Sequence, residues 1–435
     1  MRLPSFLCAF GFLSLSLAAH AGDLRSELLD IPSLSDLPIA MEVIADKEVE
    51  GVKLTEFYFN GPPFGGQPTK IYAFYAQPAG KGPFPAVVQL HGSGLEVLKP
   101  DAALGYAAHG YACISIDWAG PDWRGEGKLR EKPYSEFPSE GNRARKNPET
   151  QKWQAIPLEK DARTNGIRFI RRALQFLRDR PEVDPSKLCI SGMSAGGQAT
   201  LGVLGLEPDI KAAAVKYGSG FIKELNWGGA YGPLKAAMKD DPEGVAKWIA
   251  TLDPKHGLKN IRAATLVLSG TDDVFYFLPA VLATWRVIPA AKSLLILPND
   301  NHSQVGNEEI PRQWFDHVLT GSPVWPQVGK ISAESTDEAL RLSVEAGGDP
   351  TSAVFWFKRM PISNFWHGRA AKGEETTKWQ SVDGKKDGGQ WIASLPPLSA
   401  EEQIITYATV ENAAGTKASS DTVELPAKPD WRLPE

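Results

Sequence analysis

Between residues 84 and 319, short apolar runs alternate with longer segments whose apolar positions recur at helical spacing. Glycine, proline or acidic residues bound the runs, which is typical of strands buried on both faces of a parallel sheet. Strands are expected at 85–90, 110–117, 188–191, 210–216, 264–270 and 293–297, and helices at 102–108, 158–180, 278–287 and 307–319. The alternation predicts an α/β fold with a doubly wound, mostly parallel sheet whose carboxyl edge carries the functional groups.

The segments on either side have a different pattern. Residues 22–50 are expected to be a leader packed on the surface, and 53–59 with 70–76 to form a hairpin. After a proline-containing linker, short alternating runs follow one another without helices, at 340–344, 353–358, 390–395, 404–410 and 422–425. We therefore expect an α/β domain over 22–321 and a small all-β sandwich of the immunoglobulin or fibronectin type over 327–430.

The first residues have the pattern of an export signal. Arg2 precedes an apolar run at 6–19, and Ala19-His20-Ala21 then offers an A-x-A cleavage site. The run is too short to span a bilayer comfortably, so no stable membrane anchor is expected after cleavage. The pattern predicts a signal peptide at 1–21 and a secreted or periplasmic protein.

Composition excludes several classes of protein. The 435-residue chain is 42% hydrophobic and 23% charged, which is ordinary for a globular protein. Its net charge is −5 and both signs are interspersed, so no nucleic-acid partner is expected. Two cysteines remain after signal removal, Cys113 and Cys189, and both lie in apolar runs typical of a buried core.

One stretch, residues 121–157, lacks any periodicity. It contains Trp123, Trp153, several prolines and charges of both signs. An irregular insertion of this length is usually functional or disordered. Two interpretations remain open, a solvated surface loop and a lid-like rim beside an active site.

The segment around Ser194 reads K-L-C-I-S-G-M-S-A-G-G-Q. A buried strand turning sharply into a helix around G-x-S-x-G is the pattern of a nucleophile elbow, in which a strained turn exposes the serine hydroxyl. The positions two before and two after the serine, Gly192 and Gly196, must lack bulk where strand and helix converge. Ser194 is therefore the candidate nucleophile.

A candidate acid and then a candidate base follow Ser194 along the chain, which is the order serine, acid, histidine of an α/β-hydrolase triad. His302 comes directly after the last predicted core strand, unlike the other histidines of the chain, His20, His91, His109, His256, His317 and His367. The acid is Asp273 or its neighbour Asp272. Asp273 is preferred because a G-x-x-D spacing places its carboxylate past the strand end. The histidine would take the proton of the serine, and the acid would orient the imidazole.

An oxyanion hole completes the constellation. Residues His91-Gly92-Ser93-Gly94 form a glycine-rich turn after a predicted strand. We expect the backbone N–H groups of Ser93 and Ala195 to stabilise the developing negative charge, with His91 orienting the turn.

Residues 69–319 resemble the dienelactone hydrolase and acetyl xylan esterase branch of the α/β-hydrolase superfamily. The matching pieces are F-P-A-V-V-Q-L-H-G-S-G, H-G-Y-A-C-I-S-I-D-W-A-G, V-D-P-S-K-L-C-I-S-G-M-S-A-G-G and L-V-L-S-G-T-D-D-V. The catalytic domain of prolyl oligopeptidases shares several of them. The resemblance implies a serine nucleophile, no metal and no cofactor. It also implies that a third strand separates those of Cys113 and Cys189, too far for a disulfide.

These features favour an exported serine hydrolase that cleaves carboxylic esters through an acyl-enzyme. The expected substrate is a small-molecule or carbohydrate ester, with the acetyl xylan type favoured. Two alternatives remain, an oligopeptidase-type serine peptidase and a non-catalytic carbohydrate-binding protein on a hydrolase scaffold.

Overall fold

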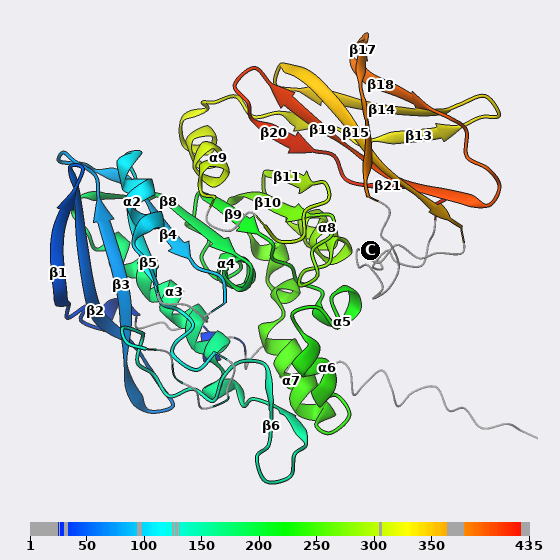
Figure 1. The fold of residues 1–435 in the computed structure, drawn as a ribbon. Helices are drawn as coiled ribbons and strands as arrows, with labels where there is room; N and C mark the ends of the chain where they lie inside the picture. Colours follow the sequence, from blue (N-terminus) through cyan, green and yellow to red (C-terminus); the bar gives the residue numbers. More distant parts are fainter. Residues whose placement is uncertain are drawn as a thin grey trace, which may run out of the picture.

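The computed structural model describes residues 25, 27–29, 34–93, 98–123, 126, 129, 131–303, 307–362 and 378–427 (Figure 1). The predicted signal peptide at 1–21 lies outside these residues. Within the described ranges, none of the helices combines the length and apolar character needed to cross a membrane.

A nine-stranded sheet forms the centre of the fold, with the strand order β1-β2-β3-β5-β4-β8-β9-β10-β11. From β5 to β11 neighbouring strands are parallel, whereas β1, β2 and β3 are joined in antiparallel pairs and β3 pairs antiparallel with β5. The predicted α/β fold with a mostly parallel sheet is confirmed. The strands are β1 (Glu42–Val49), β2 (Val52–Phe64), β3 (Gln67–Gln77), β4 (Phe84–Leu90), β5 (Ala112–Ile116), β8 (Val183–Met193), β9 (Ala212–Lys216), β10 (Ala264–Gly270) and β11 (Lys292–Leu297).

The strand β1 was not predicted from the sequence, which suggested only a leader packed on the surface over residues 22–50. It pairs antiparallel with β2 at the edge of the sheet, and nearly all of its residues are exposed. An edge strand exposed on both faces needs no apolar alternation, so the periodicity that reveals buried strands is missing here.

Helices cover both faces of the sheet. One apolar core lies between the sheet and helices α3 (Ala162–Arg178), α4 (Ala195–Leu204) and α8 (Leu278–Val287). The other lies beneath α2 (Asp101–Ala108) and α9 (Glu309–Thr320). Cys113 and Cys189 are buried and unbonded, and β4 separates their strands as the resemblance implies.

Two additional segments lie near the carboxyl edge of the parallel strands. The 121–157 insertion contains a small antiparallel sheet of β6 (Ala144–Lys146) and β7 (Trp153–Ala155). After β9, residues 222–260 contain α5 (Ile222–Leu225), α6 (Gly232–Ala237), α7 (Pro242–Leu252), η3 (Pro254–His256) and η4 (Leu258–Asn260). The helix α6 packs against β6 and β7, so the two segments support each other.

The described residues between 327 and 425 form two antiparallel sheets that share one apolar core. One sheet contains β12 (Gln327–Val328), β13 (Ser332–Ser335), β14 (Leu340–Gly347), β17 (Lys385–Asp387) and β18 (Gln390–Leu395). The other contains β15 (Pro350–Pro361), β16 (Gln380–Asp383), β19 (Glu402–Asn412), β20 (Lys417–Ser419) and β21 (Val423–Leu425). In Figure 1 the second sheet lies beside β11, where the Ile296 N–H donates to the Ser419 hydroxyl at 3.0 Å.

Candidate active site

Ser194 lies at the turn between β8 and α4. Its backbone angles are φ 56° and ψ −121°, a left-handed conformation that is strained for a residue other than glycine. The Ser194 N–H donates to the Lys216 carbonyl at 2.8 Å, which holds the turn against β9. A strained turn of this kind places the serine side chain above the carboxyl edge of the sheet.

The two glycines that flank Ser194 lie where strand and helix are too close for a side chain. A Cβ at Gly192 would collide with the Gly196 carbonyl oxygen and the Thr200 hydroxyl. A Cβ at Gly196 would collide with the His91 carbonyl oxygen. These contacts give the physical reason for the G-x-S-x-G spacing.

His302 and Asp273 meet at the end of neighbouring strands. The Nδ1 atom of His302 lies 2.9 Å from Oδ2 of Asp273, which is fully buried. The other carboxylate oxygen accepts the N–H groups of Phe275 and Tyr276 at 2.8 and 3.1 Å. Because a carboxylate only accepts, Nδ1 carries the proton of this bond and Nε2 remains available as a base.

The alternative acid, Asp272, lies elsewhere. Its N–H donates to the Asp300 carbonyl at 2.9 Å. Burial raises the pKa of its carboxyl group, and the positive charge of Lys358, from β15, opposes that rise. The structure therefore brings Asp273, and not Asp272, to the imidazole of His302.

The loop that carries His302 is held by Asp300. One oxygen of the Asp300 carboxylate accepts the Tyr217 hydroxyl at 2.5 Å and the His302 N–H at 3.3 Å. Aromatic rings surround the imidazole, with the ring centroids of Tyr217, Phe275 and Tyr276 at 4.6, 5.1 and 6.3 Å. These contacts fix the orientation of the imidazole.

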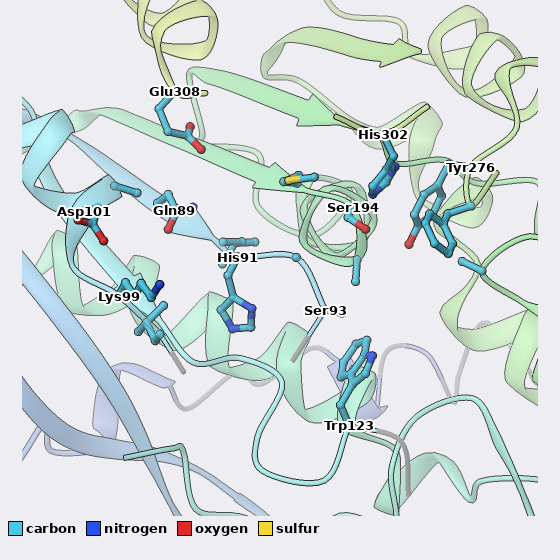
Figure 2. Close-up of a pocket in the computed structure, with 18 of the residues that line it drawn as sticks. Gln89, His91, Ser93, Lys99, Asp101, Trp123, Ser194, Tyr276, His302 and Glu308 are labelled. Carbon is cyan, nitrogen blue, oxygen red and sulfur yellow. The ribbon is translucent and has the colours of Figure 1, made fainter. Parts of the chain in front are cut away.

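Ser194 and His302 line the same cavity, which has a volume of about 890 Å³. Figure 2 shows the imidazole of His302 pointing towards Ser194, with Tyr276 beside them. The residues predicted to supply oxyanion donors, Ser93 and Ala195, also line this cavity. Ala195 is the first residue of α4, so its N–H has no acceptor within the helix.

His91 forms part of the cavity wall and is linked to the insertion through Trp118. Its Nε2 is 3.5 Å from Oδ1 of the buried Asp117, and its ring stacks on Trp118 with centroids 5.6 Å apart. The Trp118 indole N–H donates to the His91 carbonyl at 3.1 Å. Trp118 in turn packs edge-on against Trp123, at 5.2 Å.

Three polar residues of the cavity wall, Arg143, Tyr276 and Glu308, are not indicated by any sequence motif. Arg143 belongs to the 121–157 insertion, which also contributes Trp123, so this segment forms part of the rim of the cavity. Glu308 accepts hydrogen bonds from Tyr106, Ser191 and Lys216 at 2.7, 2.8 and 2.6 Å. The charges and tryptophans of the insertion suggested that this segment could lie beside the active site. They did not single out Arg143.

In the part of the chain that the structure describes, no group of three or more histidine, cysteine, aspartate or glutamate side chains could hold a metal ion.

The fold, with Ser194 on a strained strand-to-helix turn, places the protein in the α/β-hydrolase class. The family profile "Acetyl xylan esterase (AXE1)" matches residues 29–315. Because this match spans more than half of the chain, the protein belongs to the acetyl xylan esterase family and is a serine ester hydrolase. The predicted resemblance is confirmed.

Two of the solved structures that share the fold are acetyl xylan esterases. Acetyl xylan esterase 1 from Thermoanaerobacterium sp. JW/SL YS485 superposes with a TM-score of 0.55 at 19% identity, covering 70% of this chain and 98% of that one. An acetyl xylan esterase from Paenibacillus sp. R4 gives a TM-score of 0.54 at 19% identity, covering 73% and 97% of the two chains. No curated protein sequence matches this chain.

Proposed function

We infer that this protein is an exported carbohydrate esterase that removes acyl groups, with acetyl favoured, through a covalent intermediate on Ser194. The observation that carries the proposal is the His302–Asp273 contact of 2.9 Å in the cavity that Ser194 lines. Membership of the acetyl xylan esterase family supports the carbohydrate ester as substrate.

The first half of the reaction forms the acyl-enzyme. The Ser194 hydroxyl attacks the ester carbonyl while Nε2 of His302 accepts its proton, and the Asp273 carboxylate stabilises the imidazolium. The N–H groups of Ala195 and Ser93 bind the oxyanion of the tetrahedral intermediate. When the intermediate collapses, the carbon–oxygen bond to the sugar breaks, and the sugar oxygen takes the proton from His302.

The second half regenerates the enzyme. A water molecule attacks the acyl carbonyl on Ser194 and transfers a proton to Nε2 of His302. The second tetrahedral intermediate then releases the carboxylic acid, and the proton returns from His302 to the Ser194 oxygen. The chemistry consumes one water per ester and uses only side chains and backbone N–H groups of this chain.

The test is a Ser194→Ala variant assayed on acetylated xylan and on 4-nitrophenyl acetate. We expect kcat to fall about a million-fold, because loss of the nucleophile removes the acyl-enzyme route. The control is Ser186→Ala, at an exposed serine of the same strand, which should retain full activity. A fluorophosphonate should add its phosphonyl group to wild type and not to Ser194→Ala, with loss of fluoride. Retained ester hydrolysis in Ser194→Ala would remove Ser194 from the mechanism.

The same preparation separates esterase from peptidase activity. An oligopeptidase-type enzyme would cleave a prolyl 4-nitroanilide at a rate comparable to that of 4-nitrophenyl acetate, whereas we expect cleavage of the ester alone. Export is tested by expressing the full chain in a bacterium and determining the N-terminus of the periplasmic or secreted product. We expect it to begin at Gly22.

A further inference from the structure

The cavity contains a buried guanidinium to which the described part of the chain offers no hydrogen-bond acceptor. Arg143 lines the cavity and is only 8% exposed. Across the described ranges its guanidinium donates no hydrogen bond, and its Nε is completely buried without an acceptor. Its backbone is held in place, because the Arg143 N–H donates to Asp161 at 2.7 Å and its carbonyl accepts the Ile156 N–H at 3.0 Å.

Aromatic faces surround this guanidinium. It lies 5.0 Å from the ring centroid of Tyr231 and 5.9 Å from that of Trp123. Such faces attract a cation, and they orient the planar fork without using its N–H groups. Since no described side chain or carbonyl accepts from the guanidinium, the donors of Arg143 are available to a ligand in the cavity.

Among the described residues, the charged groups that act electrostatically on Arg143 leave an excess of one positive charge. These groups are a second guanidinium, Arg163, and one buried carboxylate, Asp161. The Asp161 carboxylate is already used by the N–H groups of Arg143 and Arg163 and by the Trp248 indole, at 2.7, 2.7 and 2.9 Å. Burial lowers the pKa of Arg143 to about 10, so the guanidinium is still charged at neutral pH.

Further hydrogen-bond donors, without partners in the described part of the chain, lie around the Arg143 guanidinium. The hydroxyls of Tyr231 and Tyr276 and the Nη2 of Arg163 are buried without partners among the described residues. The ring centroids of Tyr231 and Tyr276 are 6.3 Å apart, and the Tyr276 ring stacks on His302 at the same distance. Three contacts in series therefore link the guanidinium to the proposed catalytic base. Arg143, Ser194 and His302 line the same cavity, so a substrate that fills the cavity can contact both Arg143 and Ser194.

We propose that Arg143 forms a carboxylate-binding subsite, so that the preferred ester carries a carboxylate group in its acyl half or on its sugar. An unpaired buried charge is costly, and a ligand that supplies the missing anion removes this cost. A carboxylate offers two acceptor oxygens in one plane, which match the guanidinium fork. The inference rests on the proposed function in one respect, that the cavity is the ester-binding site.

Two matched pairs of substrates distinguish the sources of the carboxylate. For the acyl half, 4-nitrophenyl hydrogen succinate is compared with 4-nitrophenyl methyl succinate, which has the same chain without the charge. For the sugar, acetylated glucuronic acid is compared with acetylated glucose. In wild type we expect kcat/KM to favour the charged member of one pair, and Arg143→Gln should lower that preference about 10- to 100-fold.

The control is Arg168→Gln, because the Arg168 guanidinium also lies against a ring, 5.5 Å from Phe64, but outside the cavity wall. It should leave the preference unchanged. If Arg143→Gln does not fold, Arg143→Lys decides, since it keeps the charge and loses the fork, and the preference should still fall. A wild type that favours neither charged substrate would overturn the proposal, as would a preference that survives in both Arg143 variants.

A binding measurement separates this inference from the proposed mechanism. In a Ser194→Ala background, succinate or glucuronate should raise the Tm, glucose should not, and adding Arg143→Gln should abolish the shift. Equal shifts with and without Arg143 would overturn the subsite even if Ser194 is the nucleophile. Conversely, hydrolysis that persists in Ser194→Ala would refute the nucleophile and leave an Arg143-dependent shift intact.

Discussion

Asn299 and Trp379 exchange two hydrogen bonds. The Asn299 side-chain nitrogen donates to the Trp379 carbonyl at 3.1 Å, and the Trp379 N–H donates to the Asn299 side-chain oxygen at 2.8 Å. Asn299 also has a left-handed backbone, with φ 56°, and its N–H donates to the Thr271 hydroxyl at 2.8 Å. Because Asn299 precedes His302 in the same loop, these bonds connect the C-terminal sheets to the segment that carries the imidazole.

Replacing Asn299 with alanine should therefore affect both stability and catalysis. The variant loses the paired hydrogen bonds and places a residue that disfavours left-handed backbone at φ 56°. We expect the free energy of unfolding to fall by about 2 kcal/mol and kcat to fall about tenfold. Urea unfolding and initial rates on 4-nitrophenyl acetate measure the two effects.

A second variant separates loop positioning from general docking of the C-terminal sheets. Arg286→Gln removes the pair in which Arg286 donates to both oxygens of Asp421, at 2.6 and 2.7 Å, without touching the His302 loop. It should lower stability by about 1 kcal/mol at most and leave kcat unchanged, because the pair is partly exposed. An equal loss of kcat in both variants would contradict the positioning role of Asn299.

The elbow glycines give a steric prediction. In Gly196→Ala the new methyl group would collide with the His91 carbonyl, so either the turn after β4 or the elbow must shift. Since an error of about 1 Å in the position of a catalytic group can cost about a hundredfold in rate, we expect at least that loss of kcat/KM together with a lower Tm. Gly232→Ala is the control, because a Cβ there meets no atom within 4 Å. Wild-type activity in Gly196→Ala would show that the elbow tolerates a side chain.

The parts of the site that are local in sequence could be predicted, and those that depend on side-chain direction could not. The elbow is determined by a few consecutive residues, so G-x-S-x-G placed Ser194 correctly between strand and helix. In contrast, the choice between Asp272 and Asp273 depends on which carboxylate points towards a loop 29 residues further along the chain. Spacing favoured Asp273, and only coordinates show its contact with His302.

Arg143 illustrates a second limit. The guanidinium of Arg143 packs on Tyr231, which is distant in the sequence. The insertion that contains Arg143 also has no periodicity that would indicate which side chains point inwards. Composition suggested that the insertion was either a rim or a solvated loop. In the structure Trp123 and Arg143 of the insertion line the cavity, and α6 packs against β6 and β7. The strand β1 was missed for a related reason, since its exposed residues carry no pattern.

The identity of the acid gives a paired prediction. Asp273→Asn keeps the shape of the side chain but removes the charge that stabilises the imidazolium and can reverse the tautomer of His302, so kcat should fall about ten-thousand-fold. Asp272→Asn, one residue away and without contact to His302, should change kcat less than threefold. Initial rates with saturating 4-nitrophenyl acetate measure both variants. The reverse ranking would assign the acid to Asp272.

A buried carboxylate distant from the reaction predicts how stability depends on pH. Asp253 is fully buried, and its oxygens accept the N–H groups of Lys255 and Ile222 at 3.0 and 2.9 Å. Burial raises its pKa to about 6 from the ordinary value of 3.8. The folded state therefore holds this proton more tightly than the unfolded state does, and the stabilisation present below about pH 4 is lost as pH rises through 6.

Asp253→Asn removes this titration. The unfolding free energy of the variant minus that of wild type should become more positive by about 2.4 kcal/mol between pH 4 and pH 7. A shift of one pKa unit corresponds to about 1.4 kcal/mol, and a small part of the full effect falls outside this range. In Asp253→Asn the side-chain nitrogen cannot accept one of the two backbone N–H bonds. This loss lowers the unfolding free energy of the variant by a similar amount at every pH. It therefore shifts the difference between variant and wild type without changing how that difference depends on pH. Urea unfolding at pH 4, 5, 6 and 7 measures the difference directly. A difference that stays constant over this range would mean that Asp253 titrates alike in the folded and unfolded chains, and a decreasing difference would mean that its backbone donors outweigh its burial.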